Sequence, residues 1–246
     1  MSHIAPSETD WRQRLRDGVE LLPTLAALLP HPSPLVVDAG AYKGAFLDAV
    51  LAVRPAALVH AFEPIPRRAR KLEKVHAASP GVHVHPVALG SQDRSATLHV
   101  AAANTLSSLL AASPEGKALH GQRIATVDAP RVTVRRLDTV LQDFAPPLGG
   151  PVDLFKLDVQ GYELHVLAGS GDLLCSTRIV LAEVGFERVY ARQPLFPALD
   201  RFLRDNGFVL HGLFSLRVHT PAEGPARHLA GDAMYLNGRH TDSCHG

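Results

Sequence analysis

The stretch VVDAGAYKGAF, residues 36–46, decides the fold that this sequence predicts. It begins as a buried apolar strand, continues with the acidic residue Asp38, and then carries Gly40 and Gly44 before a helix. Glycine permits a tight turn and lets a ligand approach the main chain closely, and the first turn of a helix presents free N–H groups to that ligand. The pattern favours a nucleotide-like ligand, although a strand-capping aspartate and a tight turn without any ligand would use the same residues.

Strands and helices alternate along the rest of the chain. Apolar runs of strand length are followed by segments whose apolar residues recur once per helical turn. This alternation predicts an α/β fold in which helices cover both faces of a mostly parallel sheet. The expected strands are residues 34–40, 57–64, 82–89, 95–101, 131–137, 152–161, 178–186, 208–214 and 232–237, with a long loop at 104–122 and an exposed one at 217–228.

Composition predicts one folded domain, residues 34–240, after a short N-terminal helical extension, residues 1–33, whose helical pattern covers residues 9–29. The formal net charge of +1 gives no reason to expect binding to nucleic acid or to an anionic membrane. Cys175 and Cys244 form no metal or redox motif, and no apolar stretch is long enough to cross a bilayer. We therefore expect a soluble cytoplasmic protein without membrane insertion.

A second acidic residue narrows the choice of ligand. Glu63 ends the second expected strand, and the carboxyl ends of neighbouring parallel strands meet at one crevice, where such an acid can accept hydrogen bonds from a ribose diol. Dinucleotides favour a third glycine, which this turn lacks, and Asp38 would repel their pyrophosphate. S-adenosylmethionine has no phosphate, and an aspartate attracts its sulfonium and ammonium groups. The charges favour S-adenosylmethionine over NAD.

Seven motifs strengthen this interpretation. They are VVDAGAYKGAF (36–46), AFEPIPRRARKL (61–72), PVALGSQDRSATLHV (86–100), NTLSSLL (104–110), VRRLDTVL (134–141), LFKLDVQGYELHVLAG (154–169) and VLAEVGF (180–186). Their order resembles the FkbM family of S-adenosylmethionine-dependent methyltransferases. The resemblance implies a Rossmann-like seven-stranded methyltransferase sheet and methyl transfer to a hydroxyl of a small-molecule or glycan acceptor, a sugar or a natural product.

The resemblance also implies which residues hold the cofactor. Glu63 matches the family's ribose-binding acid, while Ser107 and Ser108 match its serine-bearing loop, for which ordinary loop hydrogen bonds are the alternative. The full expected set of cofactor-binding residues is Asp38, Gly40, Ala41, Tyr42, Gly44, Glu63, Pro64, Ala88, Ser107 and Ser108. The sequence departs from the family at Tyr42 and Pro86, where asparagine is common, and at Gln160, where glutamate is frequent.

A charged pair in an apolar strand indicates the site of catalysis. Lys156 and Asp158 lie two residues apart, so their side chains leave the same face of the strand, and an unpaired buried charge is costly. Glu183 ends the next strand and reaches the same rim. We expect Asp158, Lys156 and Glu183 to be catalytic, with a carboxylate as general base and Lys156 one step deeper, neutralising Asp158. A purely structural ion pair is the equal alternative, and Asp158 with Glu183 could also bind Mg²⁺.

Two other functions stay open at this level: an NAD-dependent oxidoreductase, and a non-catalytic ligand-binding protein on the same fold. His83 and His85 share one face of a strand, as metal ligands would, but no third ligand stands nearby in the sequence, so we interpret them as polar strand residues. Neither the identity of the acceptor nor the oligomeric state has a readable signature.

Overall fold

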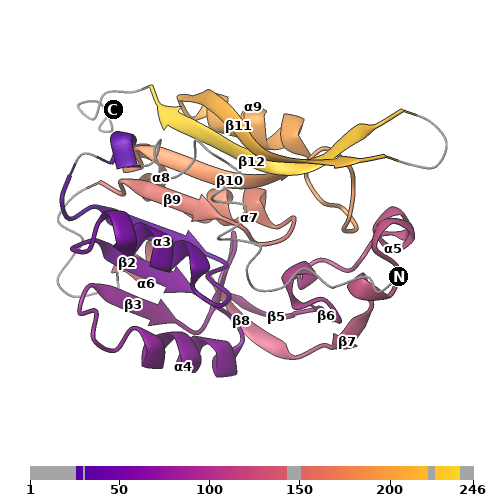
Figure 1. Cartoon of the computed structure of the whole chain (residues 1–246), viewed down its shortest axis with the longest axis horizontal. Coiled ribbons are helices and arrows are strands. Elements are labelled where there is room, and N and C mark those ends of the chain that lie inside the picture. The colour runs from indigo at the N-terminus through magenta and orange to yellow at the C-terminus, as the bar shows by residue number, and fades with distance from the viewer. Residues whose placement is uncertain (1–25, 30, 143–150, 221–224, 239–246) are drawn as a thin grey trace.

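The computed structural model describes residues 26–29, 31–142, 151–220 and 225–238. Its centre is a seven-stranded sheet in the order β11-β12-β10-β9-β1-β2-β3 (Figure 1). These strands are β1 (Leu35–Ala39), β2 (Leu58–Phe62), β3 (Val82–His85), β9 (Leu154–Leu157), β10 (Ile179–Gly185), β11 (Phe208–His219) and β12 (Arg227–Asn237). The first five pair in parallel, and β12 is antiparallel to both of its neighbours. The expected α/β methyltransferase-type sheet is confirmed.

Helices cover both faces of this sheet, because successive strand residues point to opposite sides. Val36, Val59 and Leu154 face α3 (Ala45–Val53), and the next residues along the same strands face the other layer. That second layer contains α6 (Leu137–Gln142), α7 (Glu163–Ala168), α8 (Asp172–Ser176) and α9 (Phe196–Asp205). Helix α4 (Pro66–Val75) packs Leu72 against Ala61, on the same side as α3. The strands are therefore buried on both faces, as their continuous apolar runs predicted.

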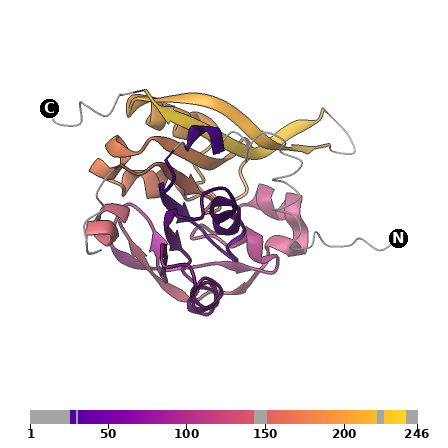
Figure 2. The ribbon, with the colours of Figure 1, turned by 60° about the vertical axis from the view of Figure 1, so that its left-hand side comes forward.

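Two expected strands are each divided between separate sheets. Residues 82–89 form β3 and then β4 (Ala88–Leu89), interrupted at Pro86, whose nitrogen has no hydrogen to donate to a ladder. Residues 95–101 form β5 (Arg94–Thr97) and β6 (Val100–Ala101). The small sheet β4-β8-β5 and the pair β6-β7 lie beside the main sheet (Figures 1 and 2); here β7 is Thr126–Asp128 and β8 is Arg131–Arg135.

The segment expected as a loop at 104–122 contains helical structure. It holds η1 (Asn104–Leu106), α5 (Pro114–His120) and the start of η2 (Gly121–Ile124). A local signal starts α5: Ser113 Oγ accepts a hydrogen bond of 2.9 Å from the Gly116 N–H, and Pro114 occupies the first helical position. This Ser-Pro signal was available in the sequence and was missed.

The expected exposed loop at 217–228 is shorter than predicted at both ends, since β11 continues to His219 and β12 begins at Arg227. The two strands form a long hairpin whose far end projects from the sheet (Figure 2). Register shifts interrupt the pairing near Gly212 and Arg217, and Ser215 adopts a φ of 49°. These irregularities break the alternation of apolar and polar residues that would have indicated strand continuity.

The N-terminal helical pattern at 9–29 lies mostly outside the described residues. Within it, the structure describes residues 26–29, and residues 26–28 are helical. Arg54 fixes this short piece by donating hydrogen bonds of 2.6 Å to the Ala26 carbonyl and 2.7 Å to the Leu29 carbonyl. Among the helices of the described residues, none combines the length and the apolar character that crossing a membrane would need.

Candidate active site

Four charged side chains meet near the carboxyl ends of β1, β9 and β10. The sheet register aligns Asp38 with Lys156, and Lys156 with Leu181. Asp158 directly follows β9, and Glu183 lies two residues beyond Leu181 on the same face of β10. The structure therefore brings together Asp38 and the three residues that the sequence predicted to be catalytic.

The turn after β1 depends on its first glycine. Gly40 has a φ of +86°, and a Cβ atom at this position would lie 2.0 Å from the Asp158 carbonyl oxygen. The main chains after β1 and β9 therefore approach each other closely at this point. Gly44 has a φ of +87° at the N-terminus of α3, and Tyr42 has a φ of 52° between them. Three left-handed residues within five positions make the sharp strand-to-helix turn that the opening motif predicted.

Asp38 and Lys156 form a buried ion pair. Asp38 is 0 % exposed and Lys156 is 3 % exposed, with 3.0 Å between Asp38 Oδ1 and Lys156 Nζ. Asp158 is the more distant partner, at 3.8 Å from the same ammonium group. Burial acts to lower the pKa of Lys156, but Asp38 and Asp158 outweigh it and keep that pKa above its usual value. Lys156 is therefore closer to Asp38 than to Asp158, and both members of the ion pair are buried.

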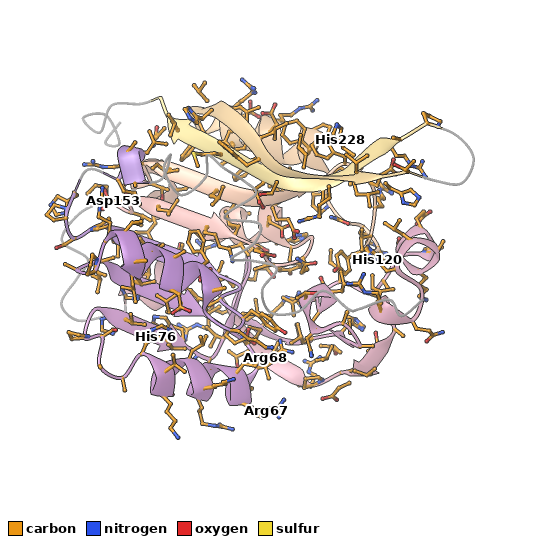
Figure 3. The ribbon with its side chains drawn as sticks, in the orientation of Figure 1. Arg67, Arg68, His76, His120, Asp153 and His228 are labelled. Atoms are coloured by element: carbon orange, nitrogen blue, oxygen red, sulfur yellow. The ribbon has the colours of Figure 1, made fainter. Side chains whose placement is uncertain are left out.

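Glu63 directly follows β2, and its carboxylate contacts the start of α4. Its Oε1 accepts a hydrogen bond of 2.8 Å from the Ile65 N–H and lies 4.0 Å from Arg68 Nη1. The Arg68 guanidinium lies 4.9 Å from the centre of the Tyr42 ring and donates a bond of 2.7 Å to Asn104 Oδ1. Arg68 lies on the sheet side of α4, whereas Arg67 lies on its outer side (Figure 3). Burial raises the pKa of Glu63 to about 7.

Asp158 and Glu183 are joined by an amide. Gln160 Nε2 donates hydrogen bonds of 2.8 Å to Asp158 Oδ1 and 2.6 Å to Glu183 Oε2. Glu183 also binds the guanidinium of Arg217, which comes from the irregular part of β11. The Tyr190 hydroxyl completes the cluster, 2.9 Å from Gln160 Oε1.

The two carboxyl groups have opposite protonation preferences. Burial and the charge of Asp158 raise the pKa of Glu183 to about 8. Burial acts in the same direction on Asp158, but Lys156 and the Gln160 amide outweigh it and hold the pKa of Asp158 below its usual value. The pKa values of the two neighbouring carboxyl groups are therefore shifted in opposite directions, upward for Glu183 and downward for Asp158. Separated pKa values of this kind are what a general base next to a proton-holding acid requires.

The site does not support Mg²⁺. The place between the two carboxylates is taken by the amide nitrogen of Gln160, which is a hydrogen-bond donor and not a metal ligand. Within the part of the chain that the structure describes, no group of three His, Cys, Asp or Glu side chains is arranged to hold a metal ion. This includes His83 and His85, which gather with His60 instead: the His60 ring centre lies 5.2 Å from each of theirs.

The remaining predicted cofactor residues differ in their surroundings. Ala41 and Ala88 are buried, and Pro64 is half-buried. The Ser107 hydroxyl donates to the Asn104 carbonyl at 2.8 Å, and the Ser108 hydroxyl donates to the Gln160 carbonyl at 2.7 Å. Both serines thus make the loop hydrogen bonds of the alternative interpretation, and Ser108 attaches their loop to the end of β9.

Sequence reasoning missed four polar residues of this site: Arg68, Tyr190, Arg217 and Asp232. Arg68 is one of five basic residues in α4, a composition typical of a solvated helix face. Arg217 and Asp232 belong to the hairpin whose extent was mispredicted; Asp232 pairs with Glu183 in the β10–β12 register. Tyr190 lies in a connecting segment that carries no periodic signal.

Comparisons with known proteins agree with this geometry. The chain is 28% identical over 207 residues to the 2-O-methyltransferase NoeI of Sinorhizobium fredii, covering 77% of this chain and 83% of that protein. It is 30% identical over 241 residues to the AMB antimetabolite synthetase AmbE of Pseudomonas aeruginosa, covering 87% of this chain but only 11% of that much longer protein. Among solved structures, a precorrin-6y C5,15-methyltransferase from Geobacter metallireducens matches 88% of each chain with 11% identity and a TM-score of 0.45.

The family described as the methyltransferase FkbM domain matches residues 38–210. This range begins at Asp38 and includes the turn after β1, Glu63, Lys156, Asp158 and Glu183. It covers more than half of the sequence, and the chain is therefore a methyltransferase that belongs to the FkbM family.

Proposed function

We propose that this methyltransferase transfers the methyl group of S-adenosylmethionine to a hydroxyl of a sugar or natural-product acceptor. The observation that carries the proposal is the arrangement at the carboxyl ends of β1, β2, β9 and β10. There, the residues expected to hold the donor adjoin a pair of carboxyl groups, Asp158 and Glu183, that Gln160 bridges. The name of the relative NoeI, a 2-O-methyltransferase, supports oxygen as the atom that receives the methyl group.

The residues fit S-adenosylmethionine better than a dinucleotide. Asp38 is fully buried, and its carboxylate lies 3.0 Å from the Lys156 ammonium group. Together with Glu63, Asp158 and Asp232 it makes the crevice rich in acidic groups, which suits a cationic sulfonium and opposes a pyrophosphate. Because Asp38 is fully buried, we assign it an electrostatic role from beneath the turn, while Glu63 is the acceptor for the ribose hydroxyls. The cofactor supplies the methyl group.

The chain's own groups account for the rest of the chemistry. Asp158 accepts the proton of the acceptor hydroxyl as the oxygen attacks, and Lys156 and Gln160 hold its carboxylate in place. The Lys156 ammonium group is engaged by Asp38 and Asp158, so we assign it the role of positioning these two carboxylates. Holding donor and acceptor in line provides much of the remaining rate enhancement.

Turnover tests this assignment. Release of S-adenosylhomocysteine is measured with a panel of sugars and polyhydroxylated small molecules, for the unmodified protein and for Asp158→Asn, which keeps the size but not the basicity of the side chain. We expect turnover to fall by roughly 10²-fold or more. Asp153→Asn is the matched control, because Asp153 lies beside the opposite end of β9, where it accepts a hydrogen bond from the Leu35 N–H (Figure 3). Normal turnover of Asp158→Asn would assign Asp158 to structure alone.

Cofactor identity needs a separate measurement. We expect S-adenosylhomocysteine to bind in titration calorimetry and NAD not to bind. Binding of NAD in place of S-adenosylhomocysteine would contradict the proposal and restore the oxidoreductase alternative. Binding of S-adenosylhomocysteine without turnover of any acceptor would leave the ligand-binding alternative.

A further inference from the structure

Gln160 has a backbone that its side chain does not favour. Its φ is 55°, in the left-handed region that residues with a Cβ atom rarely adopt, and Gly161 follows with a φ of +89°. A residue held in this region at the carboxyl end of a central strand needs compensating contacts, and such residues gather at functional sites. The contacts of Gln160 must therefore compensate for the cost of this backbone conformation.

Both the nitrogen and the oxygen of the Gln160 side-chain amide form hydrogen bonds in the observed orientation. Its two N–H groups point to Asp158 Oδ1 at 2.8 Å and Glu183 Oε2 at 2.6 Å, and its carbonyl oxygen accepts from the Tyr190 hydroxyl at 2.9 Å. The reverse orientation would lose both donor contacts and bring the amide oxygen close to the carboxyl oxygens of Asp158 and Glu183. The neighbours thus fix which end of the amide faces the carboxyl pair.

Gln160 also connects this pair to the segment Asn104–Leu110. The Ser108 hydroxyl donates to the Gln160 carbonyl oxygen at 2.7 Å. The Tyr190 hydroxyl, which contacts the Gln160 side chain, also lies 3.1 Å from the Leu106 carbonyl oxygen. The side chain of Gln160 therefore contacts the carboxyl pair, and its main-chain carbonyl contacts the segment Asn104–Leu110.

We propose that Gln160 is the positioning residue that holds the carboxyl groups of Asp158 and Glu183 in a fixed relative position and couples this pair to the segment Asn104–Leu110. The catalytic importance of this bridge by Gln160 rests on the proposed function. Two carboxylates that share one amide repel each other when both are ionised. The amide donates to both without adding a charge, which offsets this repulsion and favours the ionised form of each carboxyl group. A glutamate at position 160 would instead add a third acid to the cluster.

The other charged groups around the pair cannot replace this bridge. Lys156 reaches Asp158 but not Glu183, and Arg217 is the bound cation of Glu183. Asp232 and Glu163 add further negative charge on the Glu183 side. Glu163 is already bound to the Val159 and Gly161 N–H groups, at 3.0 and 3.1 Å. In this cluster, Gln160 is the described side chain that donates hydrogen bonds to both carboxylates.

Carboxyl ¹³C NMR of protein labelled at Asp and Glu side chains tests the proposal over pH 4–9. Gln160→Asn is the main variant, because asparagine tolerates the left-handed backbone but is one methylene too short to span both carboxylates. We expect both titration steps of the pair to move to higher pH, by about one unit, which is a tenfold change in proton affinity. Gln142→Asn makes the same change at the exposed end of α6 and should leave both steps in place.

Tyr190→Phe is the second variant and covers the case in which Gln160→Asn does not fold. It removes one hydroxyl, so we expect a smaller shift in the same direction and faster hydrogen exchange at the Ser108 and Leu110 amides. Unchanged carboxyl titration in folded Gln160→Asn, or in Tyr190→Phe if only that variant folds, overturns the proposal. These readouts use neither cofactor nor acceptor, so a shifted pair in a protein that does not bind S-adenosylhomocysteine would count against the proposed function alone.

Discussion

At the scale of single residues, Glu63 is the strongest test of the cofactor site. It is 3 % exposed, and its carboxylate is the acid that we assign to the ribose hydroxyls. Glu63→Ala removes a charged acceptor, so we expect S-adenosylhomocysteine binding to weaken by about 1.5–3 kcal/mol in titration calorimetry. Glu73→Ala, an exposed position on α4, is the control and should bind normally. Near-native affinity of a folded Glu63→Ala protein would remove Glu63 from the cofactor site.

The same residue predicts a pH dependence of binding. Burial raises the pKa of Glu63 to about 7, so the carboxylate is ionised mainly above pH 7 and protonated mainly below it. The ionised form is the better acceptor for two hydroxyls, and we expect affinity for S-adenosylhomocysteine to fall about tenfold between pH 8 and pH 6. In Glu63→Gln this part of the dependence should be absent. If the variant and the unmodified protein show the same pH profile, another group is responsible.

Asp38 and Lys156 predict a cost in stability that the sequence could not assign. Replacing Asp38 by asparagine leaves the buried Lys156 ammonium with Asp158, 3.8 Å away, as its closest carboxylate. Breaking a buried ion pair costs about 3–5 kcal/mol, and urea unfolding of Asp38→Asn should show a loss of this size. Asp93→Asn, in a surface pair with Arg135, should lose less than about 1 kcal/mol. Equal losses in the two variants would show that the buried pair contributes no more than a surface contact.

At the scale of elements, the close approach of the β1 and β9 ends depends on Gly40. An added Cβ would lie 2.0 Å from the Asp158 carbonyl oxygen, whereas at Gly44, with nearly the same φ, it would meet the flexible end of Leu72 at 2.8 Å. Both substitutions to alanine incur the cost of a left-handed backbone, about 1–2 kcal/mol. Gly40→Ala must in addition separate two strands, so it should unfold at a clearly lower urea concentration than Gly44→Ala. The opposite order would contradict this account of the turn.

The elements that the sequence predicted well are those whose signals are local. Apolar runs ended by Asp38, Glu63, Asp158 and Glu183 indicated the buried parallel strands, and glycines marked the first turn. The strands β11 and β12 were predicted at 208–214 and 232–237, but their length was underestimated because their pairing shifts near Gly212 and Arg217, which no local pattern encodes. Arg217 therefore reached the candidate site from a segment that was expected to be an exposed loop. The same limit applies to Tyr190, whose contact with Gln160 exists only in the folded chain.

At the scale of the whole molecule, buried glutamates and buried histidines make the stability of the protein depend on pH in opposite directions. The pKa values of Glu63, Glu163 and Glu183 are raised by burial, to about 7, 7 and 8, so in the folded state these groups retain protons that the unfolded chain releases. This contribution to stability is complete below the ordinary glutamate pKa and is lost as the pH rises through 7 to 8. The acid-rich site thus lowers the stability of the protein, without ligand, at mildly alkaline pH.

The histidines on β2 and β3 act in the opposite direction. Burial, with the charges of the neighbouring histidines, lowers the pKa of His60 to about 3 and that of His85 to about 4. Below the ordinary histidine pKa of about 6.5 the unfolded chain binds protons that these rings cannot bind while folded. Each ring should therefore cost stability as the pH falls from about 6.5 towards 4, on the order of 1.4 kcal/mol per pH unit. The carboxyl groups mask this loss, so it is measured as the difference in urea unfolding free energy between the unmodified protein and His60→Gln. That difference should shrink from pH 7 to pH 5. A constant difference for His60→Gln would mean that the His60 ring is protonated in the folded protein, contrary to its burial.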